Sequence, residues 1–543
     1  MLGSSRHAAR GFATGRSWQP GSSLARELSR KPAVKSLVGA TVHGAAPTHV
    51  ANPASMPLFR RGGVDKKFES GAEAAALVHR EVRRRDGAHA GLVRSVDSVA
   101  SSLIPVFDAY PRMAWAFKHL VEPERVIQFK VPWTDKDGNT RINRGCRVQH
   151  SSVLGPFAGG LSFAQDMTTS RILEDAFEQV FQNSLTGLRL GGARGGADFH
   201  PQGKTRNEIK SFCQSYIMEL ARYIGPAKDV PCGGFGVGER EIGYMYGRYK
   251  RMTRRYDGGI AGDAVVNDLA GDVSLNRERA SGTGVVLFAK QMIETASGGN
   301  NSLEGARCIV SGSGNVALAV ARALVDAGAV PITLSDTTGY VCEPGGFTSD
   351  MLDQVERVKK SNPYQYNRRM SEYCKFSATS QFFPHAKGGG ADSDSTSTTS
   401  FWEIPGDYAF PCAGHSEIGA NEAKAIVQGE VKGVFEAATM PCTQDAVRVL
   451  RSSINFLYAP AKAANAGGPI MTSLGMSHAT STNTRRLADT TQEDLFGGLF
   501  DGMSRVFDEC QHACDLYNVD MHDGANIAAF SRLGHAMIRQ GYV

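Results

Sequence analysis

The pattern of apolar and polar positions predicts a first region that begins with helices and continues as a sheet. Residues 67–120 place apolar side chains at helical spacing, as in Ala72–Val78. Two segments that read as strands follow, Arg125–Val131 and Arg141–His150. The turn Asp135–Asn139 between them is polar and contains a glycine, so the pair is predicted to form a β-hairpin.

Three glycine-rich segments come next in the chain. They cover residues 155–160, 191–196 and 233–238, and helical patterns at Ile172–Leu188 and Thr205–Ile224 alternate with them. Glycine has no Cβ, so a glycine-rich loop lets the backbone approach a small ligand closely. We therefore expect the three segments to be loops that converge on one site.

A second region carries the pattern of a dinucleotide-binding unit. A short apolar strand at Arg307–Val310 leads into the glycine turn Ser311–Ala317, a helix at Leu318–Ala327, a strand at Pro331–Leu334 and then Asp336. The turn brings the backbone close to a pyrophosphate, which the helix N-terminus attracts. The residues predicted to hold the dinucleotide here are Gly312, Ser313, Gly314, Asn315, Val316 and Asp336.

These patterns predict an α/β fold of two domains. The first is an α/β domain over residues 66–283, completed by about 490–543, and the second is a Rossmann-type dinucleotide-binding domain over 284–489. Within the second domain, residues 386–400 are rich in Gly, Ser, Thr and Asp, a composition that cannot fill a core. We predict that this segment is a surface insertion.

The N-terminal segment differs in composition from the rest. The first 60 residues contain eight Lys or Arg and a single acid, Glu27, which is typical of an organellar transit peptide. We interpret residues 1–65 as a mitochondrial transit peptide and linker, with processing near Arg10–Ala13, and we expect the protein in the mitochondrial matrix. The alternative is a basic tail that carries no address.

Charge and hydropathy change this picture little. The formal net charge of +6 comes largely from the N-terminal segment, so it does not indicate a nucleic-acid partner. No stretch approaches the roughly 20 uninterrupted apolar residues that a membrane-spanning helix needs.

The ten cysteines are scattered and unpaired, which suits a reducing compartment. Cys510 and Cys514 share a helical face with His512 nearby, but without a second pair of ligands they are read as buried thiols. We predict no metal site.

Ordered motifs along the chain resemble the glutamate dehydrogenases, from about residue 70 to the C-terminus, and most of all the short hexameric forms that usually prefer NADP. The motifs are Pro123–Phe129, Arg147–Gln149, Gly195–Phe199, Asp229–Pro231, Gly236–Gly243, Gly312–Val316, Lys462–Gly468 and Gly524–Ile527. The resemblance implies that the first domain binds substrate and forms oligomers. It also implies hydride transfer between NADP or NAD and the α-carbon of glutamate.

The sequence departs from this family at four positions that carry chemistry. The lysine of the family's GPYKGG motif, which binds the side-chain carboxylate of the substrate, corresponds to Ala158, and the lysine of FKNAL, which binds the α-carboxylate, corresponds to Gln182. The catalytic lysine of GGGKGG corresponds to Arg194, and the proton-transferring aspartate of DVPAGD to Gly234. Arginine keeps its proton in proteins, so it cannot act as a base or as an amine nucleophile. The four replacements predict an inactive member of the family.

The motifs that bind the nucleotide cofactor differ less from those of the family. Ser281 takes the place of a threonine in the family's ATGYG segment, and Asp336 lies in a loop that resembles the one beside the adenine ribose. The family's QNE is His415–Glu417, and its EGANMP is Glu436–Pro441. Binding of NADP, of NAD or of neither stays open.

Three functions are compatible with these residues. The leading hypothesis is an inactive, glutamate-dehydrogenase-like mitochondrial protein, kept as a structural or accessory subunit, either as a homo-oligomer or within a larger complex. The first alternative is an active dehydrogenase for glutamate or, with Ala158 in place of the lysine, for an apolar amino acid. The second is a non-catalytic nucleotide-binding regulator. Lys462 and Asn465 read equally well as functional residues and as packing residues.

Overall fold

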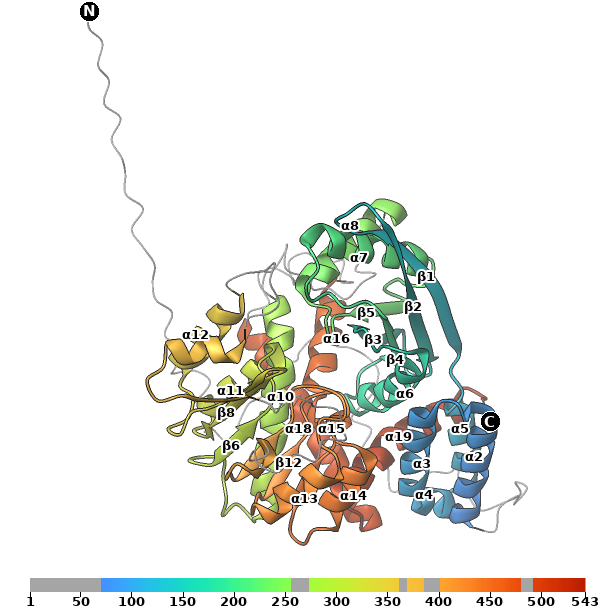
Figure 1. Ribbon diagram of the computed structural model, residues 1–543. Helices are drawn as coiled ribbons and strands as arrows, with labels where there is room; N and C mark the ends of the chain where they lie inside the picture. Colours follow the sequence, from blue (N-terminus) through green and yellow to red (C-terminus); the bar gives the residue numbers. More distant parts are fainter. Residues whose placement is uncertain (1–69, 255–272, 361–368, 385–400, 480–491, 543) are drawn as a thin grey trace, which may run out of the picture. The chain divides into compact units, whose positions relative to one another are not determined.

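The computed structural model describes residues 70–254, 273–360, 369–384, 401–479 and 492–542 (Figure 1). The predicted transit peptide and linker, residues 1–65, and the predicted insertion, residues 386–400, lie outside these ranges. Among the described residues, no helix combines the length and the apolar character that crossing a membrane requires.

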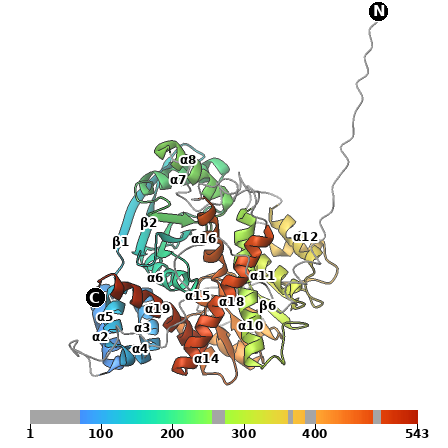
Figure 2. The same cartoon turned by 180° about the vertical axis from the view of Figure 1, so that it is seen from behind.

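The predicted N-terminal helices are present. They are α2 (Gly71–Asp86), α3 (Ala90–Ser102), α4 (Ile104–Ala109) and α5 (Pro111–Leu120). The C-terminal helix α19 (Met521–Arg539) lies beside α3 and α5, as both views show (Figures 1 and 2). Phe530 of α19 packs edge-on against Phe107 and Phe117, with ring centroids 6.2 and 5.4 Å away. The two ends of the described chain therefore share one apolar core.

The first sheet has five strands in the order β1-β2-β4-β3-β5. Its strands are β1 (Arg125–Thr134), β2 (Thr140–Ser151), β3 (Phe157–Phe163), β4 (Gly191–Ala197) and β5 (Asp229–Cys232). The predicted hairpin is confirmed, because β1 pairs antiparallel with β2 along the whole length of β1. Strand β2 pairs antiparallel with β4, whereas β4, β3 and β5 run parallel.

Two of the three glycine segments are strands, so the prediction that they are loops was wrong. Segments 155–160 and 191–196 fall largely within β3 and β4, at the middle of the sheet. A Cβ at Gly192 would lie 2.4 Å from Val180 Cγ2, and one at Gly159 would lie 1.7 Å from the carbonyl oxygen of Ala193. These glycines allow β3, β4 and helix α6 to pack closely together. Local secondary-structure propensity does not predict such long-range contacts.

Helices cover both faces of this sheet (Figure 1). They are α6 (Thr169–Leu185), α7 (Arg206–Leu220) and α8 (Glu239–Thr253). On the α7 and α8 side, Phe199 and Phe212 stack with ring centroids 3.7 Å apart, and Trp133 meets Phe199 edge-on. Helix α6 packs on the other side, where Val180 meets Gly192. Both faces of the strands that carry the candidate site are thus buried.

The second region has the predicted Rossmann character. A parallel sheet has the order β13-β12-β11-β6-β7, and a small antiparallel sheet has the order β10-β9-β8. The strands are β6 (Arg307–Val310), β7 (Val330–Pro331), β8 (Thr333–Asp336), β9 (Gly339–Cys342), β10 (Gln381–Pro384), β11 (Tyr408–Phe410), β12 (Gly433–Phe435) and β13 (Leu457–Ala459). The single strand predicted at 331–334 is in fact split, because β7 pairs with β6 and β8 pairs with β9. The bonds to β6 continue as far as the N–H of Ile332, which donates to the carbonyl of Cys308 at 2.9 Å, and beyond it the N–H of Val310 donates to the Thr333 hydroxyl instead of a backbone carbonyl.

The remaining helices, apart from α19, pack on these sheets or on one another. They are α10 (Val273–Ala296), α11 (Asn315–Asp326), α12 (Ser349–Lys360), α13 (Ala420–Gln428), α14 (Gln444–Ser452), α15 (Ala461–Ala464), α16 (Gly467–Ala479) and α18 (Gln492–Tyr517), with short 3₁₀ turns η3 (Met370–Lys375) and η4 (Phe401–Glu403). Residue 284, where we placed the start of the second domain, lies within α10, and the domain boundaries stay predictions.

Candidate functional site

The structure gathers the four departing positions around strand β3. Ala158 lies in β3 and Arg194 in β4. A Cβ at Gly160 would lie 2.9 Å from Arg194 Nη1 and 3.1 Å from the carbonyl oxygen of Gly233, the neighbour of Gly234. The sheet therefore brings the guanidinium of Arg194 and the loop after β5 to the same place.

Helix α6 is tied to this place by a buried amide. Asn183 is 1% exposed, and its Nδ2 donates to the carbonyl oxygens of Ala158 and Gly191 at 3.0 and 2.6 Å. Ala158 is 3% exposed, and Gln182 is the residue before Asn183 on the same helix. Sequence reasoning did not single out Asn183, although a polar residue among the apolar positions of a buried helix face was the available signal.

Gly234 has no room for a side chain. It forms a tight turn with Val237, in which each backbone N–H donates to the carbonyl of the other at 2.9 and 3.0 Å. A Cβ at position 234 would lie 2.5 Å from the carbonyl oxygen of Leu161 and 3.3 Å from its carbonyl carbon. The obstacle is space, since Gly234 is not among the glycines with positive φ. Any larger residue requires the turn or strand β3 to move.

Arg194 reaches toward the second region. Its Nη2 donates to Thr439 Oγ1 at 3.4 Å, and the side chain is half-buried. Thr439 lies in the Glu436–Pro441 segment that corresponds to the family's EGANMP. A guanidinium in this position supplies a fixed positive charge, but it supplies neither a base nor a nucleophilic amine.

Gln182 also makes structural hydrogen bonds. Its Nε2 donates to the backbone carbonyl of Asn465 at 2.6 Å, and its Oε1 accepts from Gln179 Nε2 at 2.9 Å. Asn465 in turn donates from Nδ2 to the carbonyl of Ala437 at 2.7 Å. An uncharged amide held this way offers no cation for a substrate carboxylate.

A buried ion pair links the strands that carry the site. Arg147 and Asp229 both have fully buried side chains, and Arg147 Nη2 and Nε donate to the two carboxylate oxygens at 2.5 and 3.0 Å. Arg147 Nη1 donates to the carbonyls of Gly159 and Gly160 at 3.1 and 3.3 Å. The pair therefore joins β2, β3 and β5.

The glycine turn of the second region has the geometry of a pyrophosphate cradle. Gly312 has φ of +79°, and a Cβ there would lie 3.0 Å from Ala413 Cα, so only glycine fits without strain. Gly314 precedes the first turn of α11, no side chain caps that helix, and a Cβ at Gly314 would meet nothing within 4 Å. Open space at an uncapped helix N-terminus fits an anion. Ser313, Asn315 and Val316 lie in the same turn.

Asp336 is already engaged. Its Oδ1 accepts from the N–H and the hydroxyl of Thr338 at 2.8 and 2.6 Å, and its Oδ2 accepts from the N–H of Met370 at 2.6 Å and from Lys359 Nζ at 3.3 Å. Burial alone would raise the pKa of Asp336, but these hydrogen bonds and the Lys359 ammonium outweigh it and lower the pKa. A ribose hydroxyl would have to share these oxygens.

Two further positions that the resemblance assigns to the cofactor, Ser281 and the His415–Glu417 loop, pack against neighbouring backbone. Ser281 lies on α10, and its Oγ would be 2.8 Å from a Cβ at Gly468 of α16. In the loop that replaces the family's QNE, Glu417 accepts from the N–H groups of Ala413 and Gly414 at 3.0 and 3.3 Å. Burial outweighs these hydrogen bonds and raises the pKa of Glu417 to about 7.

Comparison with known proteins decides the family. Residues 273–541 match the family described as Glutamate/Leucine/Phenylalanine/Valine dehydrogenase, and residues 123–251 match its dimerisation domain. The NADP-specific glutamate dehydrogenase of Chlorella sorokiniana is 40% identical over 85% of this chain and 83% of its own length. The chain belongs to the glutamate dehydrogenase family. The predicted resemblance and the two-domain α/β fold are thus confirmed.

Relatives with either cofactor are found among the glutamate dehydrogenases. The NAD-specific enzyme of Clostridium symbiosum is 37% identical over 85% of this chain and 97% of its own length. The crystal structure of Plasmodium falciparum glutamate dehydrogenase has a TM-score of 0.77 and 35% identity, and covers 90% of this chain and 99% of its own. The hetero-hexameric enzyme of Thermus thermophilus, at 21% identity and a TM-score of 0.64, shows the shared fold alone.

Lys462, in a motif shared with the glutamate dehydrogenases, does not replace the missing lysines. It is 9% exposed, and its Nζ donates to Asn526 Oδ1 at 2.7 Å and pairs with Glu178 Oε2 at 2.8 Å. The ammonium also lies 5.4 Å from the centre of the Phe181 ring. These contacts join α15 to α6 and α19, which explains the residue by packing.

One cluster in the described part of the chain has the composition of a metal site. Asp520, His522 and Asp523 offer ligand atoms within 4.8 Å of one another. Arg451 donates to Asp520 at 2.5 and 3.0 Å and to Asp523 at 2.6 Å, so one guanidinium already binds both carboxylates. Burial raises the pKa of the Cys514 thiol to about 12, which disfavours the thiolate that a metal requires.

Proposed function

We propose that this protein is a member of the glutamate dehydrogenase family that no longer turns over glutamate and that serves as a structural or accessory subunit in the mitochondrial matrix. The observation that carries the proposal is the lack of room for a side chain at Gly234. The position that holds the family's proton-transferring carboxylate has no side chain, and the Leu161 carbonyl oxygen lies only 2.5 Å from where its Cβ would be.

The other three positions support the same conclusion. Arg194 cannot release a proton, and Ala158 and Gln182 provide no cation for the substrate carboxylates. Loss of a general acid–base group alone typically lowers the rate by about 10²–10⁴-fold. The losses belong to one catalytic unit, so they do not multiply.

Steady-state reductive amination of 2-oxoglutarate by the full chain, with NADPH and with NADH, tests the lost activity. We expect no turnover above the rate without protein. Oxidative deamination of glutamate, leucine, phenylalanine and valine belongs in the same series, because Ala158 would admit an apolar side chain. Turnover near the typical enzyme value of about 10 s⁻¹ with any of these would reject the proposal.

Fractionation of cells from the source organism tests the location and the accessory role. The motivation for the location is the basic, acid-poor segment of the first 60 residues. We expect the protein in the mitochondrial matrix, co-migrating with other proteins at a native mass above that of its own oligomer. Recovery only as a free homo-oligomer would count against the accessory role, and recovery in the cytosol would count against the location.

A non-catalytic nucleotide-binding regulator is the second candidate function, favoured by the open glycine turn at Gly312–Val316. Titration with NADPH, followed by its fluorescence, separates this role from a pure scaffold. A Cβ at Gly314 meets nothing in the protein, so Gly314→Ala should leave the fold intact and obstruct a bound pyrophosphate. We expect a nucleotide-binding protein to lose about tenfold or more in affinity with Gly314→Ala. Its affinity should not change with the control Gly243→Ala in α8, where a Cβ meets nothing within 4 Å.

A further inference from the structure

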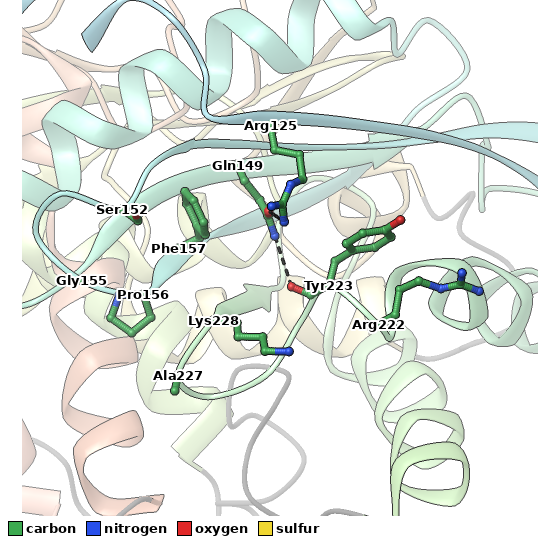
Figure 3. A pocket seen from close by; sticks show the side chains of 10 residues that line it. All are labelled: Arg125, Gln149, Ser152, Gly155, Pro156, Phe157, Arg222, Tyr223, Ala227 and Lys228. Carbon is green, nitrogen blue, oxygen red and sulfur yellow. Dashed lines mark hydrogen bonds between the residues drawn. The ribbon is translucent and has the colours of Figure 1, made fainter. Parts of the chain in front are cut away.

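A cavity of about 470 Å³ lies at the amino-terminal ends of β3 and β5 (Figure 3). The two strands meet there, because the N–H of Phe157 donates to the carbonyl of Lys228 at 2.9 Å. The lining residues are Arg125, Gln149, Ser152, Gly155, Pro156, Phe157, Arg222, Tyr223, Ala227 and Lys228. None of the four departing positions lines it, so it is separate from the candidate active site.

Three cations line this cavity and no carboxylate does. Arg125, Arg222 and Lys228 are all exposed, and among the described residues none of them forms an ion pair. Two acids adjoin these cations in sequence. Glu124 accepts from the N–H and the hydroxyl of Ser152, at 2.5 and 2.9 Å, and Asp229 is fully buried in its pair with Arg147. Like charges around one concave surface repel one another and raise the local concentration of anions.

A buried amide orients one of these cations. Arg125 Nη1 donates to Gln149 Oε1 at 3.2 Å, and Figure 3 shows the bond from Gln149 on to the carbonyl of Tyr223. Gln149 is 1% exposed, and its Nε2 is held by Asp229 Oδ2 at 2.9 Å and by the carbonyl of Tyr223 at 3.2 Å. The guanidinium therefore packs on a fixed polar group that belongs to the buried Arg147–Asp229 network.

Apolar groups also line the wall, beside the polar side chains of Gln149 and Ser152. Pro156, Phe157 and the ring of Tyr223 line the same cavity as the cations. A volume of about 470 Å³ falls within the range of small-molecule sites, which combine apolar walls with a few polar groups. This combination suits a compact carbon skeleton with several negative charges better than a bare inorganic ion.

We propose that this cavity binds a small multivalent organic anion, one that carries two or three carboxylate or phosphate groups. Its charged groups would meet Arg125, Arg222 and Lys228, and its carbon skeleton would pack on Phe157 and Tyr223. The inference does not depend on the loss of catalysis, because it uses none of the residues of the candidate active site.

Isothermal titration calorimetry of the full chain tests the proposal at constant ionic strength. The probes are citrate, a tricarboxylate, and fructose 1,6-bisphosphate, a bisphosphate, so the preferred probe identifies the charged group. The test variant is Arg222→Gln with Lys228→Gln. The control is Lys210→Gln with Arg251→Gln, which removes the same charge from exposed positions on α7 and α8.

We expect saturable one-to-one binding of at least one probe. The test variant should bind about tenfold more weakly or worse, because charge-assisted hydrogen bonds are lost, and the control within about twofold of the unmodified chain. Circular dichroism melting verifies that both variants fold, and the two single substitutions replace the test variant if it does not.

Two results would overturn the proposal. The first is the absence of saturable binding of both probes at millimolar concentration, or equal weakening in the test and control variants. The second is a change of oligomer mass in the test variant, by analytical ultracentrifugation, while the unmodified chain binds neither probe. That result would assign the cavity to an acidic side chain of another subunit.

Discussion

At the scale of single residues, Gly234 is the position where sequence and structure complement each other. The sequence predicts the missing carboxylate from the family motif alone. It does not predict that the carbonyl oxygen of Leu161 lies 2.5 Å from the place of a Cβ, because that contact joins residues far apart in the chain. The loss is therefore built into the backbone of the turn as well as into the side chain.

Gly234→Ala should destabilise the chain by about 1–3 kcal/mol, because even one methyl group overlaps the backbone of β3. Gly234→Asp should be at least as unfavourable and should not restore activity, even together with Arg194→Lys. Urea unfolding followed by circular dichroism measures the change.

The matched control is Gly243→Ala in α8, where a Cβ meets nothing within 4 Å. This substitution should stabilise the helix by up to about 1 kcal/mol, because alanine is the better helix former. Equal effects at the two positions would contradict the steric interpretation of Gly234.

At the scale of elements, the pattern of the sequence predicted what depends on local spacing. The helices of 67–120, the hairpin and the strand–turn–helix of the nucleotide unit are all present. The glycine-rich strands were predicted as loops because their glycines are required by close packing against neighbours such as Val180 of α6, and not by a turn. The hydrogen bonds from Asn183 to Ala158 and Gly191, and from Gln182 to Asn465, were not predicted either, because these partners are distant in sequence.

Asp229→Asn should destabilise the sheet strongly, because it leaves the buried guanidinium of Arg147 without its counter-charge. Removing one partner of a buried ion pair typically costs about 3–5 kcal/mol. Urea unfolding provides the measurement. The control is Asp445→Asn, whose exposed pair with Arg448 should contribute less than about 1 kcal/mol. A similar loss in both variants would show that the buried pair is not essential to the sheet.

Helix α6 carries a group that makes stability depend on pH. Burial first, and then the charges of Asp175 and Glu178, raise the pKa of Glu174 to about 7 from an ordinary value of 4.5. The folded chain therefore keeps a proton that the unfolded chain releases between about pH 4.5 and pH 7, and this contribution to stability falls as the pH rises through that window.

Glu174→Gln removes this titration. Relative to the unmodified chain, the variant should gain on the order of 2 kcal/mol between pH 5 and pH 8, measured by urea unfolding at both pH values. Glu219→Gln, an exposed position on α7, should show no such gain. A pH-independent difference for Glu174→Gln would mean that Glu174 titrates normally in the folded chain.

At the scale of the whole molecule, the family and the fold followed from ordered motifs, and both are confirmed by the comparisons. The domain boundaries, the mitochondrial location and the oligomeric state stay predictions, because they depend on contacts and partners beyond one chain. The central claim is that a glutamate dehydrogenase fold persists here around a site that cannot transfer hydride.

A single-turnover experiment tests that claim most directly. The full chain, in excess over NADPH, is mixed with saturating 2-oxoglutarate and ammonium, and cofactor oxidation is followed at 340 nm. This arrangement detects one hydride transfer even when product release is slow. We predict no substrate-dependent oxidation beyond that seen without protein, whereas stoichiometric oxidation that requires both 2-oxoglutarate and ammonium would contradict the account.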